Sequence, residues 1–226
     1  TRNSSEMSNS LNRVALDIRA AFDLAVLTQR YHRLVFDLKT GSYWLETTDA
    51  KMISLGDEHS PVDPTEDDEK ELEEKFNTEF QKYKDVMGDD VSDPASDSKI
   101  PRTSPVILAA KKLQRPRWTE VESLEWSKRK LLSSLAFKDI QAEHHNQKIS
   151  MEAPSDHPRA FIYFFPQGYV ERAVIHIRFV NGDGSLDETQ KPFTIYTWPY
   201  RGEAEIENGY IEIDVREAKD SEEEDS

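Results

Sequence analysis

The sequence predicts an α+β fold in which an N-terminal amphipathic helix packs on antiparallel β-sheet. Apolar residues recur at helical spacing near the start of the chain, and β-rich runs alternate with turn residues in its second half. A third observation is a long, charged insertion between these two parts. The 226 residues, 10% of them aromatic, suffice for one core of ordinary size with such an insertion. We therefore expect a single globular domain over residues 1–226.

The helix is expected over residues 8–30. Its apolar residues follow the i, i+3, i+4, i+7 spacing of a helix with one buried face. Ser8 or Ser10 is a candidate N-cap, because a serine hydroxyl accepts hydrogen bonds from the first free backbone N–H groups of a helix. The residues predicted to face the core are Leu11, Val14, Ala15, Ile18, Ala21, Phe22 and Ala25.

A β-hairpin is expected next, over residues 31–47. Two β-rich runs, Arg30–Asp37 and Ser42–Glu46, flank a short turn that contains Gly41.

Residues 48–115 are expected to form an acidic, partly disordered insertion. Asp57–Asp97 is dense in Asp and Glu, contains prolines and offers few apolar residues for a core. A short helical segment is predicted near Glu69–Tyr83, and the charge becomes basic beyond Lys99. A mobile surface insertion and a dedicated docking element are the two interpretations of this pattern.

Residues 116–215 are predicted to be β-rich, and residues 216–226 form an acidic tail. Leu132–Ile140 fits either a strand or the end of a helix, and Asn208–Gly209 predicts a tight turn. In the most regular run, Ala173, Ile175 and Ile177 alternate with more polar positions, which is typical of a strand with one buried face. The predicted strands are Ala160–Phe165, Glu171–Val180, Pro192–Trp198 and Ala204–Val215.

Motifs for chemistry are scarce, and no catalytic, cofactor-binding or metal-binding residue is expected. The sequence contains no cysteine, nor a nucleophile-elbow, zinc-protease, P-loop or dinucleotide-binding motif. The histidines lack metal-ligand spacing. His144 and His145 are adjacent and are expected to point apart, and His32, His157 and His176 are isolated in the sequence.

The segment Asn181–Glu188 has two interpretations. Oxygen-bearing side chains at alternate positions resemble the start of a calcium-binding loop. However, Leu186 and Pro192 stand where such a loop needs its glycine and its bidentate glutamate. Asn, Gly and Asp are also the residues that a hairpin loop favours.

The order of these elements resembles the GspH/FimT-type family of minor pseudopilins. The matching parts are the helix running into Ala25–Asp37, then Gly41–Glu46, and the Phe-Phe-Pro-Gln-Gly motif at Phe164–Gly168 with its following strand, Glu171–Ile177. Ile195–Tyr200 and Glu205–Ile213 resemble the closing pair of strands. The resemblance covers about residues 8–46 and 116–215. An unrelated α+β domain is the alternative.

The resemblance implies a structural role in a type II secretion system. Such a subunit helps to initiate or cap the periplasmic pseudopilus and supports protein export. It implies a pilin-like fold whose N-terminal membrane helix is missing here, an inner-membrane anchor, and a periplasmic globular part. The implied partners are other minor pseudopilins and the major pseudopilin. No cofactor and no small-molecule substrate are expected.

Two other functions remain open. A type IV pilus minor pilin of the same fold, in pilus assembly or DNA uptake, is the nearer one. A net charge of -15 repels phosphate backbones, so no nucleic acid is expected as a partner. Only Arg115–Lys130 offers a basic stretch. A hydrolase that uses dispersed carboxylates is the other alternative, and it would need acidic residues converging in a pocket with shifted pKa values.

Overall fold

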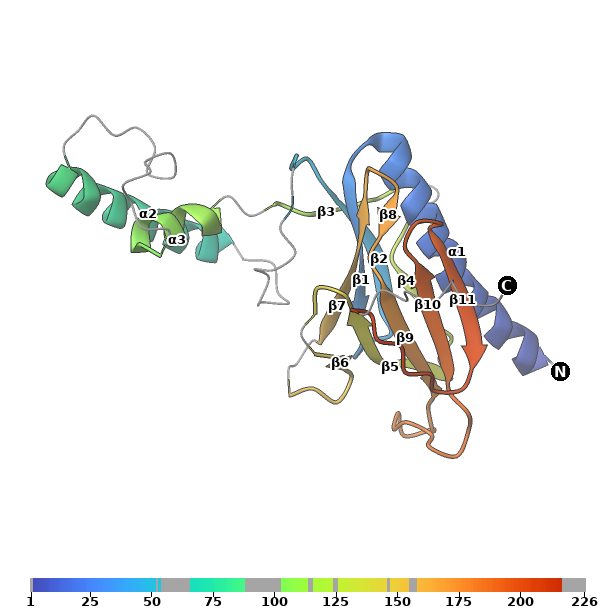
Figure 1. The fold of residues 1–226 in the computed structure, drawn as a ribbon. Coiled ribbons are helices and arrows are strands. Elements are labelled where there is room, and N and C mark those ends of the chain that lie inside the picture. The colour runs from blue at the N-terminus through green and yellow to red at the C-terminus, as the bar shows by residue number, and fades with distance from the viewer. Residues whose placement is uncertain are drawn as a thin grey trace, which may run out of the picture. The chain divides into compact units, whose positions relative to one another are not determined.

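The computed structural model describes residues 2–51, 53, 66–87, 103–113, 116–123, 126–145, 147–154 and 158–216. The chain divides into two compact units: the first comprises Thr1–Pro61 and Trp118–Ser226, and the second comprises Val62–Arg117. The first unit contains a long helix and two antiparallel sheets, and the second contains two helices (Figure 1). The α+β class with an N-terminal helix and antiparallel sheets is therefore confirmed. The second unit covers most of the predicted insertion, residues 48–115, and extends two residues beyond it. His157 and the acidic tail from residue 217 lie outside the described residues.

Helix α1 spans Arg2–Thr28 and begins earlier than predicted. The N-cap prediction is wrong, because Ser8 and Ser10 both lie inside the helix; the Ser10 hydroxyl instead accepts a hydrogen bond from the Leu132 backbone N–H at 3.1 Å. The predicted apolar face is confirmed, apart from a half-buried Ala15: Leu11, Val14, Ile18, Ala21, Phe22 and Ala25 are buried.

The helix ends in a Schellman-type turn. Gln29 adopts a left-handed conformation with φ of 54°. The Arg30 backbone N–H then donates to the Ala25 carbonyl at 3.3 Å, which satisfies a carbonyl that the last turn leaves free. The chain passes directly from this turn into the first strand.

The first sheet has the strand order β3-β2-β1-β7-β8, and β4 also pairs with β2. The predicted hairpin is confirmed: β1 and β2 pair from Tyr31 opposite Thr48 to Asp37 opposite Ser42. The Asp37 carboxylate closes the turn by accepting from the backbone of Lys39. The strands are β1 Tyr31–Asp37, β2 Ser42–Thr48, β3 Thr119–Glu120, β4 Arg129–Lys130, β7 Arg159–Phe165 and β8 Tyr169–Val170.

The second sheet has the order β11-β10-β9-β5-β6. The strand alternative for Leu132–Ile140 is correct, although the strand itself is Leu135–Ala142. Its register with β9 shifts between Phe137 and Asp139; because of this bulge, Phe137 and Ile140 both face the core. The strands are β5 Leu135–Ala142, β6 Ile149–Ser150, β9 Ala173–Phe179, β10 Phe193–Trp198 and β11 Glu203–Asn208.

The last predicted strand, Ala204–Val215, is a strand only in its first part. Its regular part ends at Asn208, and Gly209 then redirects the chain with a φ of 113°. The turn between the paired strands β10 and β11 is instead Pro199–Gly202. The tight turn predicted at Asn208–Gly209 does not connect two paired strands; the glycine instead starts a segment that leaves the strand.

The main core lies between α1 and the inner faces of both sheets. Alternate residues of each long strand enter it, for example Leu34 and Phe36 from β1 and Ile175 and Ile177 from β9. Phe36, Tyr43 and Phe137 join the two sheets through ring contacts of 5.3–6.2 Å. The apolar alternation predicted for β9 is thus confirmed.

The opposite face of the first sheet is also covered. Val35, Trp44, Phe161 and Tyr163 form a second apolar cluster there. Arg33 is buried within it, with its guanidinium 4.4 Å from the Phe161 ring centroid and its Nε 2.7 Å from Glu46. A buried arginine needs such an ionic partner, because an unpaired charge is costly in an apolar environment.

In the second unit, α2 spans Glu66–Met87 and α3 spans Pro105–Leu113. The helical segment predicted near Glu69–Tyr83 is confirmed and is longer than expected, whereas α3 was not anticipated. Val106 and Ile107 of α3 form a small cluster with Phe76, Phe80 and Tyr83 of α2.

Candidate functional site

The outward side of α1 carries exposed leucines and is the candidate interaction surface. Leu16 is 61% exposed and Leu27 is 81% exposed. They are eleven residues, or about three helical turns, apart and so lie on one face. Ala20 and Asp23 lie between them and are also exposed. This set, Leu16, Ala20, Asp23 and Leu27, is called the outer face of α1; it lies opposite the buried stripe that holds Ile18 and Ala25.

The C-terminal half of α1 is tied to the turn between β10 and β11. Arg19 donates to the Arg201 carbonyl at 2.5 Å, and its guanidinium lies 3.8 Å from Glu203. Phe22 packs directly on the backbone of Gly202. These contacts fix the rotation of the helix about its axis, and hence which residues its outer face presents.

The Phe-Phe-Pro-Gln-Gly motif lies beneath the end of the same helix. Phe164 belongs to the main core, and Gly168 has a φ of 86° at the turn between β7 and β8. Phe22 and Val26 of α1 lie 4.0 Å from where a Gly168 side chain would begin. The glycine is needed for the left-handed backbone of this turn, whereas an added Cβ would only touch the helix at ordinary contact distance.

An exposed aromatic group adjoins this turn. Tyr169 contacts Phe165 and Tyr200 edge to face, with ring centroids 5.3 and 5.6 Å apart. Tyr200 is 79% exposed. Exposed aromatic residues such as Tyr200 are enriched at protein interaction surfaces.

Asp17 anchors the middle of α1 from its buried side. It accepts a hydrogen bond from the Tyr43 hydroxyl at 2.8 Å and lies 2.8 Å from Arg129 Nε. Burial raises the pKa of Asp17, opposed by the Tyr43 hydrogen bond and then by the charges of Arg129 and Arg13. Burial and the adjacent Asp17 carboxylate raise the pKa of Tyr43. Arg129, part of the only basic stretch in the sequence, is thus engaged within the fold.

His144 and His145 do not point apart as predicted. They follow β5 in a turn, where their ring centroids lie 3.9 Å apart. His144 Nδ1 makes a short contact with the buried Glu171, which also accepts from the backbone N–H groups of His144 at 2.8 Å and Tyr163 at 3.1 Å. His144 Nε2 is buried and has no hydrogen-bond partner among the residues that the structure describes. The turn explains the error, since adjacent side chains diverge only in regular structure.

The environment of His145 favours its neutral form. Burial, and then the nearby His144, lower the pKa of His145 to about 3. Its Nε2 accepts a hydrogen bond from the Phe161 backbone N–H at 3.4 Å, which requires an unprotonated nitrogen. His32 is also buried, and burial lowers its pKa.

His176 lies on the outer side of the second sheet. Its Nδ1 is 2.6 Å from Asp139 and its Nε2 is 2.9 Å from the Ile211 carbonyl. The Tyr210 ring stacks on it at 3.8 Å, and Lys148 binds Glu212 at 2.9 Å. These contacts hold residues 209–216 across the strands. The alternation of apolar and polar residues in Tyr210–Val215 predicts a continuation of the strand Ala204–Val215, but the structure places these residues in this crossing segment.

The carboxylates of the possible calcium loop close local turns instead. Asp183 accepts from the backbone N–H of Ser185 at 2.9 Å, and Asp187 accepts from that of Thr189 at 2.8 Å. Hydrogen bonds from Thr189 and Gln190 lower the pKa of Asp187 to about 2. In the part of the chain that the structure describes, no group of three or more His, Asp or Glu side chains is arranged to hold a metal ion. The hairpin-loop interpretation accounts for these residues.

No protein-family model, curated protein or solved structure matches this chain. None of the helices among the described residues is long and apolar enough to cross a membrane.

Proposed function

We propose that this chain is the globular part of a minor pilin-like subunit that helps to initiate or cap the periplasmic pseudopilus of a type II secretion system. The observation that carries the proposal is that α1 exposes two leucines on the side opposite its buried apolar stripe. One side is buried against both sheets, and the other exposes Leu16 and Leu27. A filament subunit needs such a helix, because it must be held by its own domain while contacting neighbouring subunits.

Other features support the same function. The sheets fix the rotation of α1 through Phe22 on Gly202 and Arg19 on Arg201. The described part of α1 runs for 27 residues, about 40 Å, and its first turns are mostly exposed. Partners of such a surface would be other minor pseudopilins and the major pseudopilin, and an N-terminal membrane helix would anchor the subunit.

Secretion in the host bacterium tests this proposal. The chromosomal gene is replaced by a Leu16→Asp/Leu27→Asp variant, and export of secreted proteins and pseudopilus formation are measured. We expect loss of export with a normal level of folded protein, because charges on the outer face of α1 oppose apolar packing between subunits. Val86→Asp is the matched control, since Val86 is also 81% exposed but lies on α2. Normal export by the leucine variant would overturn the proposal.

The alternative of a type IV pilus minor pilin in DNA uptake has its own test. Lys128 and Arg129 are directed to Trp44 and Asp17 within the fold, at 4.4 and 2.8 Å. This engagement weakens the case for a phosphate-binding patch. Titration of a labelled DNA duplex at several salt concentrations distinguishes the two functions, because binding through phosphates weakens steeply as salt rises.

A further inference from the structure

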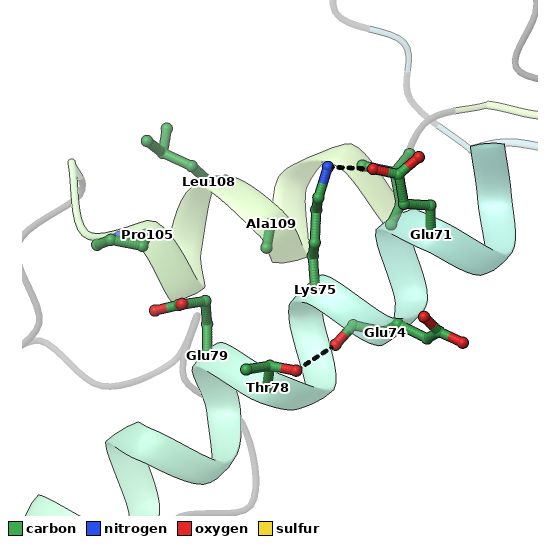
Figure 2. A pocket seen from close by; sticks show the side chains of 9 residues that line it. Glu71, Glu74, Lys75, Thr78, Glu79, Pro105, Leu108 and Ala109 are labelled. Carbon is green, nitrogen blue, oxygen red and sulfur yellow. Dashed lines mark hydrogen bonds and ion pairs between the residues drawn. The ribbon is translucent and has the colours of Figure 1, made fainter.

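The second unit contains an apolar groove with an acidic border. The groove lies between α2 and α3 and has a volume of about 560 Å³ (Figure 2). Leu72 of α2 and Pro105, Leu108 and Ala109 of α3 supply its apolar lining. Leu108 is 47% exposed, so its side chain does not belong to the cluster that joins the two helices.

The border of the groove is negatively charged. Of the residues whose side chains the structure describes, Glu71, Glu74 and Glu79 line it together with Lys75. Lys75 is already paired with Glu71 at 2.6 Å (Figure 2). Glu79 is paired with Lys82 at 2.8 Å. The three lining glutamates still outnumber the one lining lysine, and α2 as a whole carries more than twice as many acidic as basic residues. The α2 border of the groove is therefore net acidic.

In the described part of the second unit, the two helices keep apolar side chains exposed, at Leu108 and Val86. The described contact between them rests on five partly or fully buried side chains, those of Val106, Ile107, Phe76, Phe80 and Tyr83. Helical bundles usually gain stability when a further helix covers such a groove with its own apolar stripe. The acidic border specifies the flanks of that stripe, because Lys and Arg there would face Glu74 and Glu79.

We propose that this groove binds an amphipathic helix of a partner protein with an apolar stripe flanked by lysine or arginine. Leu72, Leu108 and Ala109 receive the apolar stripe, and Glu74 and Glu79 face the basic flanks. The proposal concerns the second unit and is independent of the function proposed for the outer face of α1. A nucleic acid or an anionic membrane is disfavoured, because the border would repel either one.

The test uses the whole protein and a fluorescein-labelled, 18-residue helical peptide of leucine and lysine arranged with one apolar face. Fluorescence anisotropy measures its binding, and a peptide of the same composition in scrambled order measures attraction by charge alone. We expect the amphipathic peptide to bind about tenfold more tightly than the scrambled one, since only it can bury leucines in the groove.

Protein variants locate the binding site. Leu108→Ser and Glu74→Lys/Glu79→Lys should each weaken binding by about tenfold or more. The matched controls Val86→Ser and Glu120→Lys/Glu207→Lys alter exposed residues that do not line the groove, and they should bind normally. Far-UV circular dichroism checks that each variant keeps its helices. Equal binding of the two peptides, equal losses in the controls, or no binding would overturn the proposal. A dimer of the protein that Leu108→Ser dissociates would also overturn it, by assigning the groove to a second copy.

Discussion

Replacing Gly202 by alanine tests how α1 is attached to the sheets. Gly202 lies in the turn between β10 and β11 with φ of +63° and faces Phe22. An added Cβ would lie 2.7 Å from Phe22 Cβ and nearer still to Cγ and Cδ1. Because the helix backbone fixes Phe22 Cβ, a rotamer change cannot relieve the overlap. The helix or the turn would have to move.

Two costs add in this variant. Alanine in the left-handed region costs about 1 kcal/mol relative to glycine, and overpacking a well-packed core costs about 1–3 kcal/mol. The unfolding free energy should therefore fall by about 2–4 kcal/mol, which corresponds to a Tm lower by roughly 5–15 °C. Gly184→Ala is the matched control, because its φ is +83° and no described atom lies within 4 Å of an added Cβ. This variant should therefore lose only the roughly 1 kcal/mol of the left-handed conformation.

Urea unfolding monitored by circular dichroism measures both variants. A double-mutant cycle with Phe22→Ala identifies the contact, because this change removes Cγ and Cδ1 while leaving Cβ. In the Phe22→Ala background, the penalty of Gly202→Ala should shrink but stay above that of Gly184→Ala. Equal penalties for the two glycine variants, or a Gly202 penalty that Phe22→Ala leaves unchanged, would refute the reasoning.

Three further predictions concern the interior and the second unit. The free energy of unfolding should fall as the pH drops from 6.5 towards 3. Burial lowers the pKa of His145 to about 3, so in this range the unfolded chain takes up a proton that the folded chain excludes. Urea midpoints should therefore be lower at pH 4 than at pH 7, and His145→Gln should reduce the difference. Tyr43→Phe should cost about 1.5–3 kcal/mol in the same assay by removing the hydrogen bond to buried Asp17; a cost under about 0.5 kcal/mol would contradict this. Replacing residues 62–117 by a short Gly-Ser linker should preserve the near-UV circular dichroism of the sheets, since these residues form a separate unit; loss of that signal would show that the unit is needed for the fold.

The elements that the sequence predicted well are those with local signals. The stripe containing Val14, Ile18 and Ala25 identified the buried face of α1, because helical periodicity alone decides which residues share a side. The hairpin around Gly41 followed from two β-rich runs and a turn residue. Both features depend on residues close together in the chain.

The errors concern features set by distant contacts. Ser10 resembles an N-cap, but its hydroxyl accepts from Leu132 far along the chain. His144 and His145 come together because a turn follows β5 and Glu171 holds His144 from another segment. Nor does periodicity reveal the bulge near Lys138, which depends on pairing with β9. The outer face of α1 could be located from the sequence as the side opposite the apolar stripe, but the contacts that orient it could not.

The buried carboxylates bear on the choice between a scaffold and an enzyme. Glu171 accepts from two backbone N–H groups, and Glu46 binds Arg33 and the Trp44 indole at 2.7 and 2.8 Å. These acceptors already serve to hold strands and turns together. Replacing one of them should therefore lower stability before it changes any activity, since buried donors would be left unpaired. Loss of export in a Glu171→Gln variant would therefore be evidence for a catalytic role only if the variant stays folded and assembles normally. In that event the scaffold proposal would be wrong, because a structural subunit needs no single titratable side chain once it is folded.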